Sequence, residues 1–477
     1  MGMGQRPCGR AGGGGTRRLM LFASQSFLVV FLPLVLGLYY AVGDSRAARQ
    51  GVIIAASVLF YGLWDWRFVP FWLAMIGFSQ MVAFMWGRTG RRMWLRVGIA
   101  GNLAVLFGFK YADWLAGSVM HWMGRDHMAW SIVLPLGLSF FVFQKISYLV
   151  DLGRGQARVY RLADFMEFVT FFPQLVAGPI VRHNELIPQF DNSPRNAAMW
   201  ENLGRGSLLL LVGLGKKVGL ADTLGTICAP VFDAAHAGHV PGMGAAWLAA
   251  VAYMLQIYFD FSGYSDMAIA MALMMGIRLP FNFNAPYTAV SVRDFWRRWH
   301  MTLSRFLRDY IYIPLGGNRC TPLRQAVNVM VTMGLAGVWH GAGWNFVVWG
   351  LLHGAALAVA HAWDRAGRVM PLVGGYVLTM GFVLLTWVVF RAADLATAGR
   401  MLGAMAGLHG MGGTAVRHPA VLALAAAVAV IGPASQQVVI ERLQPAPWMA
   451  VAAGVAFVLL VFLIGGRPPE PFIYFQF

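Results

Sequence analysis

Long apolar stretches separated by short polar loops follow one another along the chain, from residue 19 to residue 464. A helix needs roughly 20 apolar residues to cross about 30 Å of hydrocarbon. The stretches, in order, are Leu19–Val42, Val52–Trp64, Phe68–Trp86, Leu95–Met120, Trp130–Val150, Phe165–Ile180, Leu203–Leu220, Gly244–Ile277, Ala326–Trp339, Phe346–Trp363, Leu372–Phe390, Ala420–Ile431 and Trp448–Ile464. Several are shorter than a full span. The pattern therefore predicts an all-α, polytopic membrane protein with about 11 transmembrane helices plus re-entrant or in-plane helices.

The segment 280–319 departs from this pattern, because it is too polar to span a membrane and too aromatic for a solvated loop. On a helix, one face would carry Phe295, Trp299, Thr302, Phe306 and Tyr310. Such a face predicts an amphipathic helix that lies in the membrane interface or lines a cytoplasmic cavity.

A second irregular segment, Phe172–Arg182, reads FPQLVAGPIVR and places two prolines and a glycine inside an apolar stretch. Irregular backbone at membrane depth is tolerated only against protein or a water-filled cavity. We therefore expect a broken or re-entrant helix that lines a tunnel.

Composition agrees with a membrane protein, since 58% of the 477 residues are hydrophobic and only 12% are charged. Soluble domains carry about a quarter charged residues. The formal net charge is +17, and its arginines lie in short loops between apolar stretches. This favours positive-inside loops and anionic lipid headgroups over nucleic acid. A basic cytoplasmic surface would also suit an anionic acyl donor such as coenzyme A.

Three scattered cysteines and the lack of any metal-binding motif predict neither a disulfide framework nor a metal site. Residues 1–19 are rich in glycine and arginine and have no apolar face to bury, so we expect a disordered tail. Met20 opens the apolar part directly and is a candidate translation start. Residues 20–477 are then expected to form a single membrane domain.

His340 is the first candidate for chemistry, in the sequence LAGVWHGAGWNF directly after an apolar stretch. A titratable side chain at membrane depth is costly unless something uses or satisfies it. A neutral imidazole takes a proton from a hydroxyl or thiol near pH 7, which suits acyl transfer. A core histidine bonded to a carbonyl is an equally weighted alternative. Trp339 and Asn345 flank His340 and are candidate substrate contacts.

His300, in WRRWHMTLS, is either a second polar group near an acyl donor or an interfacial histidine, and the local sequence favours the second reading. The neighbouring Arg297, Arg298 and Arg305 are candidates for binding an anionic donor. Because 340 − 300 = 40 residues separate the two histidines, any pairing between them must be spatial.

Asp260 and Asp266 lie in YFDFSGYSD, within a long apolar stretch. Carboxylates in such a place normally face a cavity or a partner cation. We expect them to hold helices together or to orient a histidine, rather than to act directly in catalysis.

Four sequence blocks resemble the membrane-bound O-acyltransferases, and within them the branch that O-acetylates alginate. They are FFPQLVAGPIVR, YFDFSGYSDMAIAMALMMGIRLPFNFNAPY, FWRRWHMTLSRFLRDYIYIPLGGNR and GLAGVWHGAGWNFVVWGLLHG. The resemblance runs from about Met20 to the C-terminus. It implies an all-helical fold around a narrow tunnel, with His340 as the catalytic residue and His300 as the second polar position.

The resemblance also implies a reaction. An acetyl group would leave a cytoplasmic thioester, acetyl-coenzyme A or another acyl thioester, and cross the bacterial inner membrane for O-acetylation of an exported polysaccharide. It implies a periplasmic SGNH-type acetyltransferase as partner and a polysaccharide synthesis and export complex around it. The polymer, whether alginate or another exopolysaccharide, stays open.

Three other functions remain as alternatives. A transporter should show inverted repeats with paired broken helices, whereas the sequence has one candidate break, at Pro173–Pro179. A scaffold for a polysaccharide synthase would not need the histidines. A lipid or protein acyltransferase of the same superfamily is the nearest alternative among enzymes.

Overall fold

The structure is a computed structural model that describes residues 20–130, 132–176, 178–412, 416–444, 446–466 and 472–473. The predicted disordered tail, residues 1–19, lies outside this part. The described residues form helices and no strand, which confirms the all-α prediction.

Five helical segments of the described residues are long and apolar enough to cross a membrane. They are α2–α3 (Arg46–Asp65 and Val69–Thr89), α12 (Met243–Met274), α16 (Trp344–Arg365), α17 (Leu372–Arg391) and α20 (Pro447–Gly465). Shorter apolar helices cover Phe27–Ala41 and α19 (Pro419–Ile431). The chain is thus a polytopic membrane protein, while the count of about 11 spans and the tunnel stay predictions.

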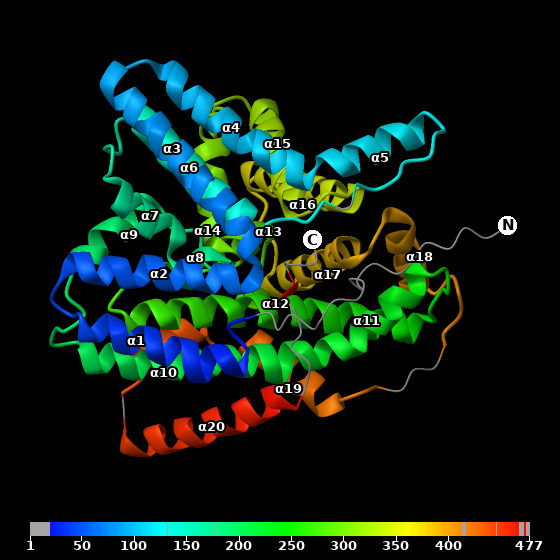
Figure 1. The fold of residues 1–477 in the computed structure, drawn as a ribbon. Coiled ribbons are helices and arrows are strands. Elements are labelled where there is room, and N and C mark those ends of the chain that lie inside the picture. Colours follow the sequence, from blue (N-terminus) through cyan, green and yellow to red (C-terminus); the bar gives the residue numbers. More distant parts are fainter. Residues whose placement is uncertain are drawn as a thin grey trace.

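Helix α12 lies inside the bundle, whereas α20 lies at its edge, and further helices complete the fold (Figure 1). They are α1 (Leu32–Ala41), α4 (Arg92–Lys110), α5 (Ala112–Trp122), α6 (Leu138–Gly153), α7 (Leu162–Thr170), α8 (Phe172–Leu175), α9 (His183–Leu186), α10 (Met199–Leu214), α11 (Asp222–His236), α13 (Val292–Arg298), α14 (Met301–Leu307), α15 (Pro322–His340) and α18 (Leu395–Met405).

Helices α15 and α16 form a tight hairpin that places His340 at its tip. At Gly337 a Cβ atom would overlap the backbone carbonyl of Phe346, and at Gly350 it would overlap that of Met333. Glycine at both positions lets the two helix backbones touch, as small residues do between membrane helices. The hairpin therefore depends on these glycines.

The predicted break at Phe172–Arg182 is confirmed. Helix α7 ends at Thr170, α8 has four residues, and the described residues 178–182 are not helical. This backbone is buried against protein, as the membrane requires. Its amide groups find partners there, since the N–H of Ile180 donates to Thr302 Oγ1 at 2.9 Å.

The segment 280–319 is not one continuous amphipathic helix, because the chain breaks between α13 and α14 at Trp299 and His300. The backbone here instead forms hydrogen bonds with residues 282–284, which come earlier in the chain. The N–H of Asn284 donates to Arg298 O, and the N–H of Met301 donates to Asn282 O, both at 2.9 Å. His300 takes a left-handed conformation with φ +42°, which is uncommon for a residue with a side chain. This break in the helix directs the side chain of His300 into the protein core.

One surface gathers three arginines, from the start of α2, from the segment after α8 and from α14, and each pairs with a carboxylate far away in sequence. Arg46 pairs with Glu167 at 2.6 Å, and Arg305 pairs with Glu185 at 2.6 Å. Arg182 pairs with Asp309. Burial would raise the pKa of the Asp309 carboxyl, but hydrogen bonds and positive charge from Arg308 and Arg182 hold that pKa below its usual value. We call this surface the basic face.

Candidate active site

The C-terminal end of α15, where His340 lies, is capped by the junction of α4 and α5. Lys110 Nζ donates to the carbonyl of Trp339 at 2.6 Å and to that of His340 at 3.0 Å. The hydroxyl of Tyr111 donates to Val338 O at 3.0 Å. The last carbonyls of a helix have no partner within it, and a cation there is favourable. Lys110 and Tyr111 thus fix the position of the His340 backbone.

Sequence reasoning missed Lys110, although a signal was present. It is a cation in the middle of the apolar stretch Leu95–Met120, whose other cation, Arg96, lies at the start, and a charge at such depth normally has a partner.

The imidazole of His340 is buried in an aromatic enclosure. Its ring centroid lies 5.0 Å from Trp339, 5.1 Å from Trp349 and 5.3 Å from Phe390. Lys110, His300 and His353 lie close enough to interact with it electrostatically. The enclosure excludes bulk water, so charges that form inside it interact strongly.

Asn345, a predicted substrate contact, stabilises this enclosure through hydrogen bonds to the backbone at the end of α17. Its Nδ2 donates to Ala392 O at 2.8 Å and lies 3.5 Å from Phe390 O. The amide thereby holds the end of α17 next to the His340 ring. Its described contacts are with backbone.

His300 is fully buried, and its hydrogen bonds define its tautomer. His300 Nδ1 lies 3.0 Å from Asn282 Oδ1. The same oxygen accepts the N–H of Thr302 at 3.4 Å and its hydroxyl at 3.0 Å, while Asn282 Nδ2 donates to Ser265 Oγ at 3.2 Å. A backbone N–H can only donate, so the amide oxygen must face this side. His300 Nδ1 therefore carries the proton and donates it.

The other ring nitrogen, His300 Nε2, is then an acceptor in the neutral ring. It is buried and makes no hydrogen bond to any residue that the structure describes. Buried polar atoms are nearly always satisfied, so an exception calls for an explanation. The left-handed backbone at the same residue is a second departure of the kind that gathers at active sites.

Trp339 lies between the two histidines. Its ring centroid is 6.2 Å from that of His300 and 5.0 Å from that of His340. It also stacks on Phe143 at 5.3 Å. Its indole N–H is buried and has no hydrogen-bond partner among the described residues. The fold thus brings the two candidate histidines together around one tryptophan.

The three candidate arginines are not part of this arrangement. Arg298 pairs with Asp294 at 2.8 Å and Arg305 pairs with Glu185 at 2.6 Å, while Arg297 is exposed. No described contact joins any of the three to His300 or His340. They lie on the surface of the segment that carries His300.

Asp260 and Asp266 also lie apart from the histidines, each paired with a lysine of the π-helical turn Gly215–Ala221. Lys217 contacts Asp260 at 2.8 Å and Lys216 contacts Asp266 at 2.7 Å. The N–H of Ile473 donates to Asp260 at 2.7 Å, and the hydroxyl of Ser435 donates to Asp266 at 2.6 Å. The carboxylates therefore tie α12 to the preceding π-helical turn, to Ser435 and to the C-terminal segment.

A second buried histidine cluster lies beneath the basic face and was not expected from the sequence. His183 bonds Asp151 at 3.1 Å and Tyr160 at 3.0 Å, and the hydroxyl of Tyr310 donates to Asp151 at 2.6 Å. Both ring nitrogens of His183 are thus occupied, unlike those of His300. This cluster fastens the segment that carries His300 to α6.

Comparison with known proteins defines the class. The family model described as membrane-bound O-acyltransferase matches residues 102–396, a range that includes both histidines. The chain is 42% identical to the probable alginate O-acetylase of Azotobacter vinelandii over 399 residues, which cover 81% of this chain and 78% of that protein. It is 38% identical to the peptidoglycan O-acetyltransferase of Helicobacter pylori over 430 residues, covering 82% of this chain and 81% of that protein.

A more distant relative is the teichoic acid D-alanyltransferase of Streptococcus thermophilus, 29% identical over 50% of this chain and 60% of its own length. The fold and these matches define a multi-span membrane enzyme that transfers acyl groups. The chain belongs to the membrane-bound O-acyltransferase family.

Proposed function

We propose that the chain moves an acetyl group from acetyl-coenzyme A, or another cytoplasmic acyl thioester, across the inner membrane for O-acetylation of an exported polysaccharide. The observation that carries this is the meeting of two buried histidines at Trp339, with His300 Nε2 held as an acceptor nitrogen. The substrate class comes from the relatives, which act on alginate and on peptidoglycan according to their names.

In the proposed reaction His340 promotes attack on the thioester carbonyl, as base or as transient nucleophile. As base, it takes the proton of the attacking hydroxyl while the oxygen bonds to the carbonyl carbon. The C–S bond then breaks, and coenzyme A leaves as its thiolate, which takes up a proton. His300 Nε2 is the second acceptor nitrogen of the proposed site, and Trp339 packs against the acyl group.

The basic face gives the reaction a direction. Cytoplasmic loops carry the excess of lysine and arginine, so we place this face in the cytoplasm, where the exposed Arg297 would attract an anionic donor. Arg297, Arg298 and Arg305 would act at this entry step. Helix α4 runs 19 residues from Arg92 to Lys110, which is about 28 Å at 1.5 Å per residue. His340, capped by Lys110, then lies well toward the opposite side.

Transfer of the acetyl group from the cytoplasm outward would require partner proteins. An acetyl group delivered outward needs an acceptor outside the cytoplasm. We propose a periplasmic SGNH-type acetyltransferase and a polysaccharide synthesis and export complex as partners.

The test is the acetyl-ester content of cell-surface polymers in a deletion strain. The strain is complemented with wild type, His340→Ala, His300→Ala or the control His239→Ala, at matched membrane levels. His239 is exposed in the loop before α12 and should not matter. Wild type and the control should restore acetate, and the two site variants should not. Full restoration by His340→Ala would exclude the assignment and favour a transporter or scaffold.

Exopolysaccharide and peptidoglycan fractions are assayed separately, which identifies the polymer. Acetate restored in lipid or protein and in neither polymer would point to another acceptor class.

A further inference from the structure

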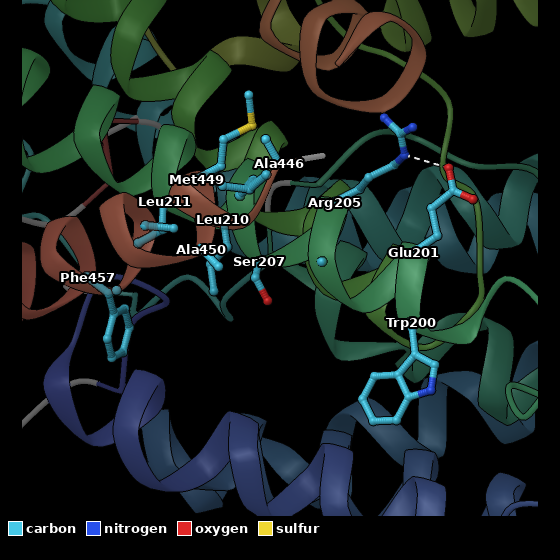
Figure 2. A pocket seen from close by; sticks show the side chains of 14 residues that line it. Trp200, Glu201, Arg205, Ser207, Leu210, Leu211, Ala446, Met449, Ala450 and Phe457 are labelled. Atoms are coloured by element: carbon cyan, nitrogen blue, oxygen red, sulfur yellow. Dashed lines mark hydrogen bonds and ion pairs between the residues drawn. The ribbon is translucent and has the colours of Figure 1, made fainter. Parts of the chain in front are cut away.

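A groove of about 690 Å³ lies between α10 and α20, on the side of the bundle where α20 is peripheral. Figure 2 shows its lining, which is mostly apolar, with Glu201, Arg205 and Ser207 as its polar members. Three small residues at intervals of four, Ala446, Ala450 and Gly454, hollow out the α20 side. Residues four apart lie on one face of a helix, so the hollow runs along α20.

Helix α20 forms one side of the groove and lies at the edge of the bundle (Figure 1). Helix α20 has 6% of its most apolar window buried, so it faces the hydrocarbon of the bilayer. Acyl chains are the apolar material at hand that is thin enough to fill the space.

One end of the groove is polar and lies at the start of α10. Trp200 is 76% exposed there, as expected of a tryptophan at the membrane interface. Glu201 and Arg205 form an ion pair at 2.7 Å, with the Glu201 side chain 55% exposed. Arg205 also donates to Val439 O at 2.7 Å. These two bonds use two of the five guanidinium N–H donors.

This pair carries a positive and a negative group side by side at headgroup level. The remaining Arg205 donors match a phosphate, and Glu201 matches a nearby ammonium. The pattern is complementary to a zwitterionic headgroup with an amine, and less so to an anionic one, which Glu201 would repel.

We propose that the groove binds one glycerophospholipid with a phosphoethanolamine headgroup. Its acyl chains lie between α10 and α20, its phosphate contacts Arg205, and its ammonium contacts Glu201. The lipid fills the space between the outermost helix and the bundle and so supports the attachment of α20. This site is separate from the histidines and does not depend on the proposed acyl transfer.

The test is native mass spectrometry of the full-length protein released from nanodiscs that contain phosphatidylethanolamine and phosphatidylglycerol in equal amounts. We expect one retained phosphatidylethanolamine per chain, favoured at least fivefold over phosphatidylglycerol. The double variant Ala450→Leu, Gly454→Leu fills the groove and should lower retention about tenfold. Ala452→Leu introduces a leucine at an exposed position of α20 outside the groove and should retain lipid as wild type does.

A second variant covers the case in which the double variant does not fold. Glu201→Gln keeps the groove volume and removes only the contact with the ammonium, so it should abolish the preference for phosphatidylethanolamine. Equal retention of the two lipids by wild type would overturn the proposal. So would a preference unchanged in Glu201→Gln, or a photo-crosslink from position 450 to another protein in place of lipid.

Discussion

Two sets of polar side chains are buried within the apolar part of this chain, and their surroundings differ. The carboxylates of α12, Asp260 and Asp266, each contact a lysine and a further hydrogen-bond donor. His300 has one nitrogen bonded to Asn282 and the other without a partner among the described residues. All three cost free energy to bury. For the two carboxylates, ion pairs and hydrogen bonds offset the cost of burial and hold helices together. An acceptor without a partner, such as His300 Nε2, instead points to a ligand that is not part of the chain.

Replacing His340 by alanine should have the largest effect. Acetyl transfer should fall by about 10²- to 10⁴-fold, the usual contribution of a positioned acid–base group. The folded yield should change little, because the α15 tip is held by backbone contacts from Lys110 and Tyr111. Acetate release from labelled acetyl-coenzyme A, per folded molecule, measures this change.

Replacing Lys217 by methionine should give the opposite result. The change leaves Asp260 and Asp222 without their shared cation, whose contacts are both 2.8 Å. Removing one partner of a buried pair costs about 3–5 kcal/mol, so the unfolding temperature in detergent should drop sharply. Activity per folded molecule should persist. A stable but inactive protein would instead place Asp260 in the reaction.

Changes at Asn282 should be intermediate and should depend on the replacement. Asn282→Leu removes the acceptor for His300 Nδ1–H, and activity should fall about 10- to 100-fold, as when a partner that orients a histidine is lost. Asn282→Asp keeps an oxygen acceptor, supported by Thr302 and Ser265, and should retain most activity. Equal losses in both variants, at equal folded yield, would show that the tautomer does not matter.

Asn345→Ala should have the smallest effect. It removes the hydrogen bond to Ala392 O and leaves that carbonyl buried, at a cost of about 1–3 kcal/mol. We expect a lower unfolding temperature and a modest loss of activity through displacement of Phe390. A loss as large as that of His340→Ala, without destabilisation, would mean that Asn345 contacts substrate.

Features with a local cause were predictable from the sequence. The break at Phe172–Arg182 follows from two prolines and a glycine in an apolar stretch, and the helical membrane architecture follows from hydropathy. His340 was chosen as a candidate because it follows an apolar stretch directly.

Features set by distant partners were not predictable. The turn that buries His300 depends on backbone pairing between residues 282–284 and 298–301, which overrides the helical periodicity of the segment. Glu185, the partner of Arg305, lies 120 residues earlier, so the arginines looked free in the sequence. The capping of α15 by Lys110 spans 229 residues, so the sequence could indicate that Lys110 needs a partner but not which one.

The most direct test compares His340→Ala with Lys217→Met in purified, nanodisc-embedded protein supplied with labelled acetyl-coenzyme A. The rate is expressed per folded molecule. The account predicts that His340→Ala folds and is at least 100-fold slower than wild type, while the surviving Lys217→Met protein works at close to the wild-type rate. A wild-type rate in His340→Ala would contradict it.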